Sequence, residues 1–410
     1  MSVLKVLFIV AAAVSFANAQ SKKTPKAVFI IIDGIPADVI EKLQPAALME
    51  ISKAGGYTRA YTGGIKDAYN QTPTISAPGY NNVITGVWGN KHNVWDNDID
   101  EPNYSYWNIF RIAEKVNPSL KTAVFSTWTD NRTKLVGEGL EQAGNIKLDY
   151  SFDGLELDTV NYPHDKSTNY IKKIDEAVSA QAAAFIQERG PDLSWVYLEY
   201  TDDMGHGFGD SDQFYNAIHG ADLQIKRIWD AITLREQSFN EDWLIVITTD
   251  HGRSADTGKN HGGQSDRERT AWIVTNSKNL NEHFHNNAAA VDILPSIANH
   301  LGIRIPDEQR NELDGTPFVG TLDITDLKAT RQENKIVVEW KSHAKDDRKV
   351  EIYLSVTNHF KKGDKDEYVK VGEVPVKQQR YPVTVKSQSD FYKILVKTPN
   401  QALNTWIIKK

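Results

Sequence analysis

The chain has 410 residues, of which 40% are hydrophobic and 25% are charged, and it contains no cysteine. This length and composition are typical of a soluble globular protein with one large domain and room for a smaller module. The net charge of −7 argues against binding to a nucleic-acid duplex, because an acidic surface repels a polyanion. The lack of cysteine excludes disulfides, thiolate metal ligands and any nucleophile derived from cysteine.

The first residues are typical of a cleavable signal peptide. Lys5 precedes a short apolar run at residues 6–16, and Ala17-Asn18-Ala19 has the small-x-small pattern of a cleavage site. That run is too short to span a membrane, and no later segment approaches the roughly 20 apolar residues that a spanning helix needs. We therefore expect a signal peptide at residues 1–19, cleavage after Ala19, and a secreted or periplasmic protein without a membrane anchor.

Short apolar runs alternate with helical patterns over residues 20–320. The runs lie at residues 27–32, 123–125, 195–198, 244–247 and 271–274, and the helical patterns at 38–54, 167–188, 212–234 and 288–301. Continuous apolar strands separated by helices are typical of a parallel sheet that is covered on both faces. We predict an α/β domain with a mainly parallel sheet and helices on both faces.

The pattern changes after residue 320. Six short β-rich segments follow one another without an intervening helical pattern, at residues 336–340, 350–356, 368–376, 381–385, 391–396 and 405–408. Such a series is typical of a small antiparallel sandwich. Residues 321–410 are therefore predicted to form a fibronectin-like β-sandwich, with an accessory role in structure or binding.

Acids and histidines follow three of these apolar runs, and a further histidine lies in the loop before the next run. Asp33 comes directly after the first apolar run, Asp202-x-x-x-His206 after the third, and Asp250-His251 after the fourth, while His261 lies in the next loop. Each alone is more often a cap, a turn former or a solvated side chain. Together they lie where open α/β sheets place ligands, and carboxylates with imidazoles suit zinc.

Ser76 is the candidate nucleophile. Pro78 fits the first turn of a helix, which places Ser76 at or near a helix N-terminus, where free N–H groups and positive potential favour an oxyanion. The alternative is that Ser76 only caps this helix, since serine is a favoured capping residue.

These motifs, taken in order, resemble those of the alkaline phosphatase superfamily, and most closely its nucleotide pyrophosphatase/phosphodiesterase branch. Ser76-Ala77-Pro78-Gly79 followed by Val83-Ile84-Thr85-Gly86 is similar to the nucleophile segment, and Val94-Trp95-Asp96-Asn97 to the motif that comes next. The Asp-x-x-x-His pair, Asp250-His251-Gly252 and His261-Gly262 are similar to the remaining motifs. The resemblance covers roughly residues 27–320.

The resemblance implies two zinc ions per chain. It groups Asp202, His206 and His261 around one ion, and Asp33, Asp250, His251 and the oxygen of Ser76 around the other. Two cations about 4 Å apart can stabilise the attacking and departing oxygens of an in-line displacement. Ser76 would then form a covalent phosphoseryl intermediate, and Asn97 would donate to a phosphoryl oxygen.

The resemblance leaves the substrate open. Serine replaces the threonine of nucleotide-cleaving relatives, and Ala77 replaces the aromatic residue that stacks on a base; Tyr162, Trp128 or Trp95 are alternatives for stacking. We expect a small phosphate ester as substrate, with a preference for a phosphodiester or nucleotide pyrophosphate. The alternative is an alkaline phosphomonoesterase, in which Arg132 and Lys134 hold the extra phosphate charge, unless they form a solvated surface pair.

Three other functions are less favoured. A sulfatase requires an arginine where Tyr80 stands, and it binds calcium through oxygen ligands rather than zinc through imidazoles. A phosphonate hydrolase could use the same metal ligands. A non-catalytic binding protein could keep the fold, but it has no need to keep the nucleophile and every ligand.

Overall fold

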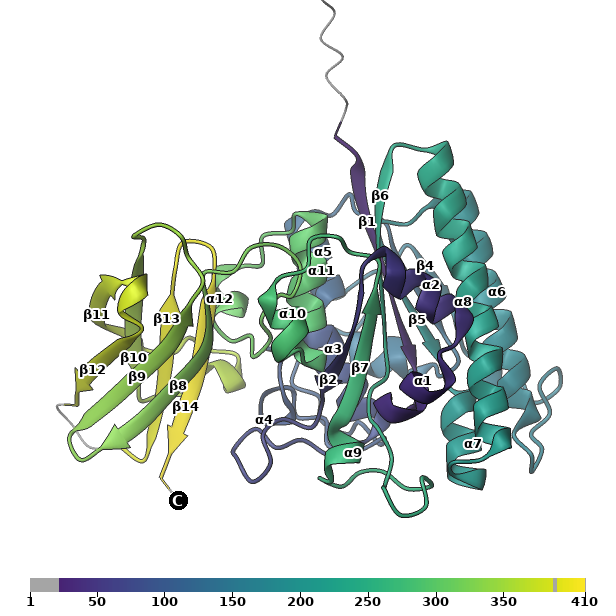
Figure 1. Cartoon of the computed structure of the whole chain (residues 1–410), viewed down its shortest axis with the longest axis horizontal. Helices are drawn as coiled ribbons and strands as arrows, with labels where there is room; N and C mark the ends of the chain where they lie inside the picture. Colours follow the sequence, from purple (N-terminus) through teal and green to yellow (C-terminus); the bar gives the residue numbers. More distant parts are fainter. Residues whose placement is uncertain (1–21, 386–388, 410) are drawn as a thin grey trace, which may run out of the picture.

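A computed structural model of the chain describes residues 22–385 and 389–409. The predicted signal peptide lies outside the described residues. A seven-stranded sheet forms the centre of the larger part of the molecule (Figure 1). In sheet order its strands are β2 (Gly56–Tyr61), β7 (Thr270–Thr275), β6 (Glu241–Thr248), β1 (Thr24–Ile32), β5 (Leu193–Leu198), β3 (Thr122–Ser126) and β4 (Tyr150–Phe152).

Five neighbouring strands, from β6 to β4, run parallel, and β7 and β2 add antiparallel pairs at one edge. The central strand β1 alternates between two hydrophobic cores. Phe29 and Ile31 pack on one face of the sheet, whereas Ile30 and Ile32 pack on the other. Burial on both faces explains the continuous apolar runs of the sequence. The predicted mainly parallel α/β sheet is confirmed.

Helices cover both faces, as predicted. One face carries α1 (Ala37–Leu43), α2 (Ala46–Ala54), α6 (Asn169–Arg189), α7 (Tyr200–Phe208) and α8 (Asp212–Ser238). The other carries α3 (Ser76–Thr85), α5 (Ile109–Val116), α10 (Glu282–Asn286) and α11 (Ile293–Leu301). Shorter helices complete this part of the molecule: α4 (Gly89–His92), η1 (Asn131–Val136), η2 (Leu155–Leu157), α9 (Asp266–Arg269), η3 (Ala290–Asp292) and α12 (Asp307–Arg310). Within residues 22–385 and 389–409, no helix has the length and apolar character needed to cross a membrane.

Two antiparallel sheets face each other after residue 320 (Figure 1). One sheet contains, in order, β11 (Val369–Pro375), β10 (Lys349–Ser355), β13 (Phe391–Lys397) and β14 (Ala402–Ile408), and the other contains β12 (Arg380–Thr384), β9 (Lys335–Ser342) and β8 (Ile324–Gln332). Short 3-10 helices η4 (Phe360–Lys362) and η5 (Val376–Gln378) lie in the connections. The two sheets enclose a hydrophobic core of their own, which includes Trp340 and Ile394. We call this unit the sandwich; the boundary at residue 320 stays a prediction.

Buried charges join the sandwich to the larger part. The Lys91 ammonium of α4 donates to the Glu312 carbonyl at 2.7 Å, to Asp314 at 2.6 Å and to Asn404 of β14 at 2.9 Å. The Lys393 ammonium of β13 donates to both Glu312 carboxylate oxygens at 2.9 Å. Because α4 follows α3 closely in the chain, the sandwich packs directly against the segment that leads from Ser76 towards Asn97.

Candidate active site

The carboxyl ends of three neighbouring central strands carry the candidate ligands. Asp33 follows β1, Asp202 and His206 lie on α7 directly after β5, and Asp250 and His251 follow β6. Since β6, β1 and β5 are adjacent and parallel, their ends meet at one edge of the sheet. The fold therefore brings together residues that are more than 200 positions apart in the sequence.

Asp33, Asp250 and His251 form a fully buried group, which we call the inner cluster. The His251 Nε2 atom lies 3.1 Å from Asp250 Oδ2 and 3.5 Å from Asp33 Oδ1. Among the described residues, none donates to or accepts from these three atoms in a hydrogen bond. Three unpaired polar atoms that converge in a buried space are costly unless a further group binds them.

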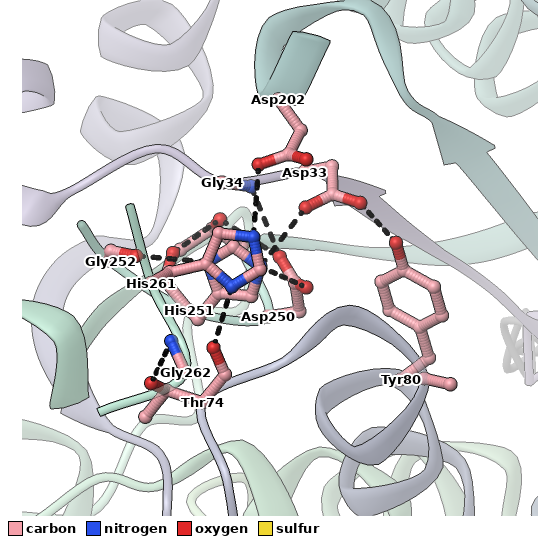
Figure 2. Close-up of polar contacts among 12 residues, drawn as sticks. Asp33, Gly34, Thr74, Tyr80, Asp202, Asp250, His251, Gly252, His261 and Gly262 are labelled. Carbon is pink, nitrogen blue, oxygen red and sulfur yellow. Dashed lines mark hydrogen bonds and ion pairs between the residues drawn. The ribbon is translucent and has the colours of Figure 1, made fainter. Parts of the chain in front are cut away.

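Asp202, His206 and His261 form the outer cluster. The His206 Nε2 atom lies 3.1 Å from Asp202 Oδ2 and 3.0 Å from His261 Nε2. The His206 side chain is 47% exposed, so this cluster opens to solvent. The His261 and His251 rings stack with their centroids 3.7 Å apart, which places the outer cluster directly beside the inner one (Figure 2).

Hydrogen bonds fix the orientation of the candidate ligands. The His251 Nδ1 atom lies 2.9 Å from the Gly252 carbonyl oxygen, and the His261 Nδ1 atom lies 2.9 Å from the Thr74 carbonyl oxygen. A carbonyl can only accept, so both rings hold their proton on Nδ1 and point an Nε2 lone pair into the site. This arrangement is typical of histidines that bind metals.

Neutral donors hold the two inner carboxylates. Asp33 Oδ2 accepts from Tyr80 (Figure 2). It also accepts from Tyr197 at 2.7 Å, and the two phenols contact each other. Asp250 Oδ1 accepts from the Gly34 backbone N–H at 3.1 Å. Each carboxylate therefore keeps its second oxygen, Asp33 Oδ1 or Asp250 Oδ2, for the inner cluster.

The electrostatics of the inner cluster favour a bound cation. Burial, together with the charges of Asp250 and Asp202, raises the pKa of Asp33 well above its usual range. Burial and the Asp202 charge raise the pKa of Asp250 to about 7. Burial and the neighbouring His261 hold the pKa of His251 well below its usual range, so that ring is neutral. Positive charge at this point would relieve the repulsion between the carboxylates.

The outer carboxylate is already stabilised. Burial acts to raise the pKa of Asp202, but the hydrogen bond from His206 and the charge of Arg253 outweigh it and leave that pKa lowered. In each cluster, the atoms that three side chains offer lie within 4.8 Å of one another. Each cluster is made only of carboxylates and imidazoles, which are donors that zinc accepts.

Ser76 is the first residue of α3, and it is 7% exposed. The N-cap of this helix is Ile75, without a side-chain capping bond, so the Ser76 hydroxyl is not used as a cap. A Cβ atom on Gly79 would lie 2.8 Å from that of Asp250, which shows how closely α3 packs on the inner cluster. One turn after Ser76, Tyr80 bonds to Asp33.

Asn97 lies beside the start of the same helix. Its Oδ1 atom accepts a hydrogen bond from the Ala77 backbone N–H at 3.0 Å. With the oxygen fixed in this way, the amide nitrogen is the group of Asn97 that is left to donate. The side chain is exposed, so a bound ligand can reach this donor.

A comparison with protein families assigns the chain to one of them. The model of the family described as type I phosphodiesterase / nucleotide pyrophosphatase matches residues 27–369. The chain belongs to this family. Membership confirms the resemblance inferred from the motifs, and it agrees with the expected class of enzyme, a phosphoric ester hydrolase.

One curated relative shows a distant match to this chain. Human ectonucleotide pyrophosphatase/phosphodiesterase family member 1 is 21% identical over 236 residues, which are 56% of this chain and 24% of that protein. The chain therefore spans less than a quarter of that relative's length.

Two solved structures resemble this fold. The phosphonate monoester hydrolase of Agrobacterium radiobacter is 14% identical, with a TM-score of 0.50, and the match covers 94% of this chain and 89% of that one. Ps i-CgsB in complex with k-i-k-neocarrahexaose is 15% identical, also with a TM-score of 0.50, over 79% of this chain and 88% of that one. Such low identities show a shared fold alone, and this agrees with the α/β architecture.

Arg132 and Lys134, the two residues considered for phosphate binding, form ion pairs with carboxylates. Arg132 donates to Asp153 at 2.5 and 3.1 Å and to Glu138 at 2.9 Å. Lys134 lies 3.0 Å from an Asp130 carboxylate oxygen. These contacts argue against a phosphate-binding role, because a phosphate would have to compete with carboxylates already in place. The expected alternative was a solvated surface pair, and the two side chains instead bind carboxylates.

The three aromatic candidates for stacking lie in different surroundings. Trp128 packs edge-on against Tyr80, with centroids 6.3 Å apart, and so lies next to the inner cluster. Trp95 is 41% exposed, and its indole N–H bonds to Asn93. Tyr162 is partly buried against the core on the α6–α8 face. Of the three stacking candidates, Trp128 is therefore the one that contacts a residue bonded to a candidate ligand.

Sequence reasoning missed three residues that donate hydrogen bonds to the candidate ligand carboxylates. Tyr80 stands four positions after Ser76, so the helical spacing could have suggested that it lies on the same face. Tyr197 lies in an apolar strand, where the pattern reads simply as core. Arg253 follows the Asp250-His251 motif by two positions, and nothing in its spacing signals that its guanidinium is buried.

Proposed function

We propose that this protein is a secreted, zinc-dependent phosphodiesterase that hydrolyses small phosphate esters through Ser76. The observation that carries the proposal is the pair of adjacent three-ligand clusters beside the first turn of α3. Family membership supports the class of reaction. The signal-peptide pattern of residues 1–19 supports export.

The ligand sets support two zinc ions, one in each cluster. Asp33, Asp250, His251 and the Ser76 oxygen would hold the inner ion, and Asp202, His206 and His261 would hold the outer one. Zinc bound there would supply positive charge for the attacking and departing oxygens. The exposure of His206 supports entry of the substrate from the outer side.

The protein's own residues account for the remaining steps. Ser76 Oγ attacks phosphorus, so that a new oxygen–phosphorus bond forms while the bond to the leaving alcohol breaks. The N-terminus of α3 adds the positive potential of a helix start beside the phosphoryl oxygens. Asn97, held by the Ala77 N–H, donates its amide hydrogen to one of these oxygens. Water then cleaves the phosphoseryl bond and restores Ser76.

A diester is favoured over a monoester as substrate. A phosphomonoester carries one more negative charge than a diester, and its recognition requires an additional cation. Arg132 and Lys134, the candidates for that role, are already paired with Asp153, Glu138 and Asp130. The phosphomonoesterase remains the alternative function, and it requires Arg132 to leave these carboxylates.

Substitution of Ser76 tests the central claim. Ser76→Ala should abolish hydrolysis of a nitrophenyl phosphodiester, while metal analysis still finds close to two zinc ions per chain. Chelation should inactivate the parent enzyme, and zinc should restore it. Undiminished turnover by Ser76→Ala, or full activity of verified metal-free protein, would remove the proposal.

The choice between diester and monoester has its own test. We expect the parent enzyme to hydrolyse the diester faster than the matching nitrophenyl phosphate, and Arg132→Ala to change both rates in parallel. A selective loss of the monoester rate in Arg132→Ala would instead favour the phosphomonoesterase.

A further inference from the structure

Arg253 is a buried cation that contacts several of the segments carrying candidate ligands. Its side chain is 0% exposed. The guanidinium donates to the Gly34 carbonyl at 2.9 Å and to the Lys259 carbonyl at 2.8 Å. It also donates to the Asp202 carbonyl at 2.7 Å and to Asp202 Oδ1. One side chain therefore joins the segment after β1, the start of α7 and the loop that leads to His261.

Two glycines make room for this guanidinium. A Cβ atom on Gly205 would lie 2.2 Å from Arg253 Cζ. A Cβ atom on Gly34 would lie 2.3 Å from Asp202 Oδ1 and 3.0 Å from Arg253 Nη2, and Gly34 has a left-handed backbone with φ of 68°. The slot between α7 and the end of β1 thus fits an arginine side chain closely.

Arg253 divides the two oxygens of Asp202 between two tasks. Oδ1 accepts from Arg253 and lies 3.9 Å from His261 Nε2, whereas Oδ2 lies 3.1 Å from His206 Nε2 and has no bond to Arg253. The inner carboxylates are held by phenols and a backbone N–H, so Asp202 differs from them in having a charged donor. A charged donor holds a carboxylate more firmly than a neutral one.

We propose that Arg253 is a positioning residue that holds Asp202 as a one-oxygen ligand and thereby sets the zinc affinity of the outer cluster. The inference rests on the proposed two-zinc function. Loss of an outer-shell partner of a metal ligand typically lowers metal affinity by about 10- to 100-fold. Because Arg253 bonds to a ligand side chain only in the outer cluster, we expect the loss to be confined to that site.

Zinc titration of the two sites separately tests the proposal. A protein carrying Asp250→Ala and His251→Ala reports on the outer site, and one carrying His206→Ala and His261→Ala reports on the inner site. Arg253→Met is added to each, and zinc dissociation constants are measured by competition with a chromophoric chelator. We expect the outer constant to rise by about 10- to 100-fold and the inner one to stay within the scatter of the measurement.

A second variant perturbs Arg253 without removing its charge. Gly205→Ala places a methyl group where the guanidinium lies, so it should weaken the outer site selectively, as Arg253→Met does. Gly207→Ala is the matched control on α7, because a Cβ atom there meets nothing within 4 Å. It should leave both affinities unchanged. Thermal unfolding of each metal-free variant shows whether the fold is retained.

The outcomes separate the two proposals. Equal weakening of both sites would mean that Arg253 acts only on the fold and would overturn the positioning role, as would unchanged affinity at the outer site. If the parent backgrounds themselves bind no zinc, the proposed function fails and the inference fails with it. Selective weakening in both Arg253→Met and Gly205→Ala supports the inference.

Discussion

Lys393 provides a direct test of how the sandwich is joined to the larger part of the molecule. Its ammonium group makes three contacts, at 2.9 Å to each Glu312 oxygen and at 2.5 Å to Asp366. The side chains of Lys393, Glu312 and Asp366 are 0%, 2% and 1% exposed. Lys393→Met would leave two buried carboxylates facing each other without a cation.

The expected cost follows from this burial. Removing one partner of a buried ion pair destabilises a protein by about 3–5 kcal/mol, because the remaining charge stays buried and unpaired. Lys370 is a matched control in the sandwich, since it also contacts two carboxylates, Glu351 and Glu373, both at 2.6 Å. Its side chain is 40% exposed, so Lys370→Met should destabilise the protein far less than Lys393→Met does.

Urea unfolding at neutral pH measures both losses without adding salt, which would screen the exposed pair. Adding Glu312→Gln and Asp366→Asn to Lys393→Met should recover part of the stability, because these changes remove the unpaired charges. Equal losses for Lys393→Met and Lys370→Met would refute the reasoning, since burial would then not decide the cost.

Two further predictions concern other parts of the larger unit. Gly79→Ala should lower the free energy of unfolding by about 1–3 kcal/mol, because its Cβ atom would lie 2.8 Å from that of Asp250 and would push α3 away. It should also lower the rate of hydrolysis, because α3 carries Ser76. Gly220→Ala, in an open position of α8, should instead stabilise the protein by about 0.5–1 kcal/mol, and urea unfolding compares the two. Although burial acts to lower the pKa of His283, the adjacent Asp292 carboxylate 2.7 Å away raises it above the usual 6.5. The stability difference between the parent and His283→Gln should therefore be full below pH 6.5 and decline as the pH rises through the raised pKa; a flat difference from pH 5 to pH 9 would contradict this.

Much of the fold could be predicted because burial on two faces leaves a simple pattern. The apolar runs at β1, β5 and β6 are continuous, and the helices between them follow the expected spacing. The errors lie where local chemistry interrupts or hides a pattern. The predicted helix at residues 38–54 is two helices, because Gln44 turns left-handed with φ of 46° and Pro45 begins a new helix.

The strands that were missed have weak patterns for physical reasons. β2 begins with Gly56 and contains Arg59, and only Ala60 of its six residues is buried. β8 reads as polar because most of its residues are at least partly exposed, and the register of its pairing with β9 shifts between Thr325 and Lys328. An exposed or irregular strand lacks the continuous apolar signal that a buried central strand must have.

In the candidate site, the sequence predicts the metal-ligand candidates but not the residues that orient them. A metal ligand must be one of a few residue types, so Asp33, His206 and His261 stand out as candidates once their order along the chain is noticed. The groups that orient such ligands need only to donate or accept a hydrogen bond. A phenol, a guanidinium or a backbone carbonyl serves equally well, and each can come from any element that packs nearby.

Tyr197 and Arg253 illustrate this freedom of the orienting groups. Tyr197 comes from a core strand, whereas Arg253 comes from a loop and reaches Asp202 across a slot left by Gly205 and Gly34. Their roles depend on distances between segments far apart in the chain, and no local spacing encodes those distances. The residue types of the ligands therefore predict that a site binds metal. The residues that orient those ligands can be identified only from the three-dimensional structure.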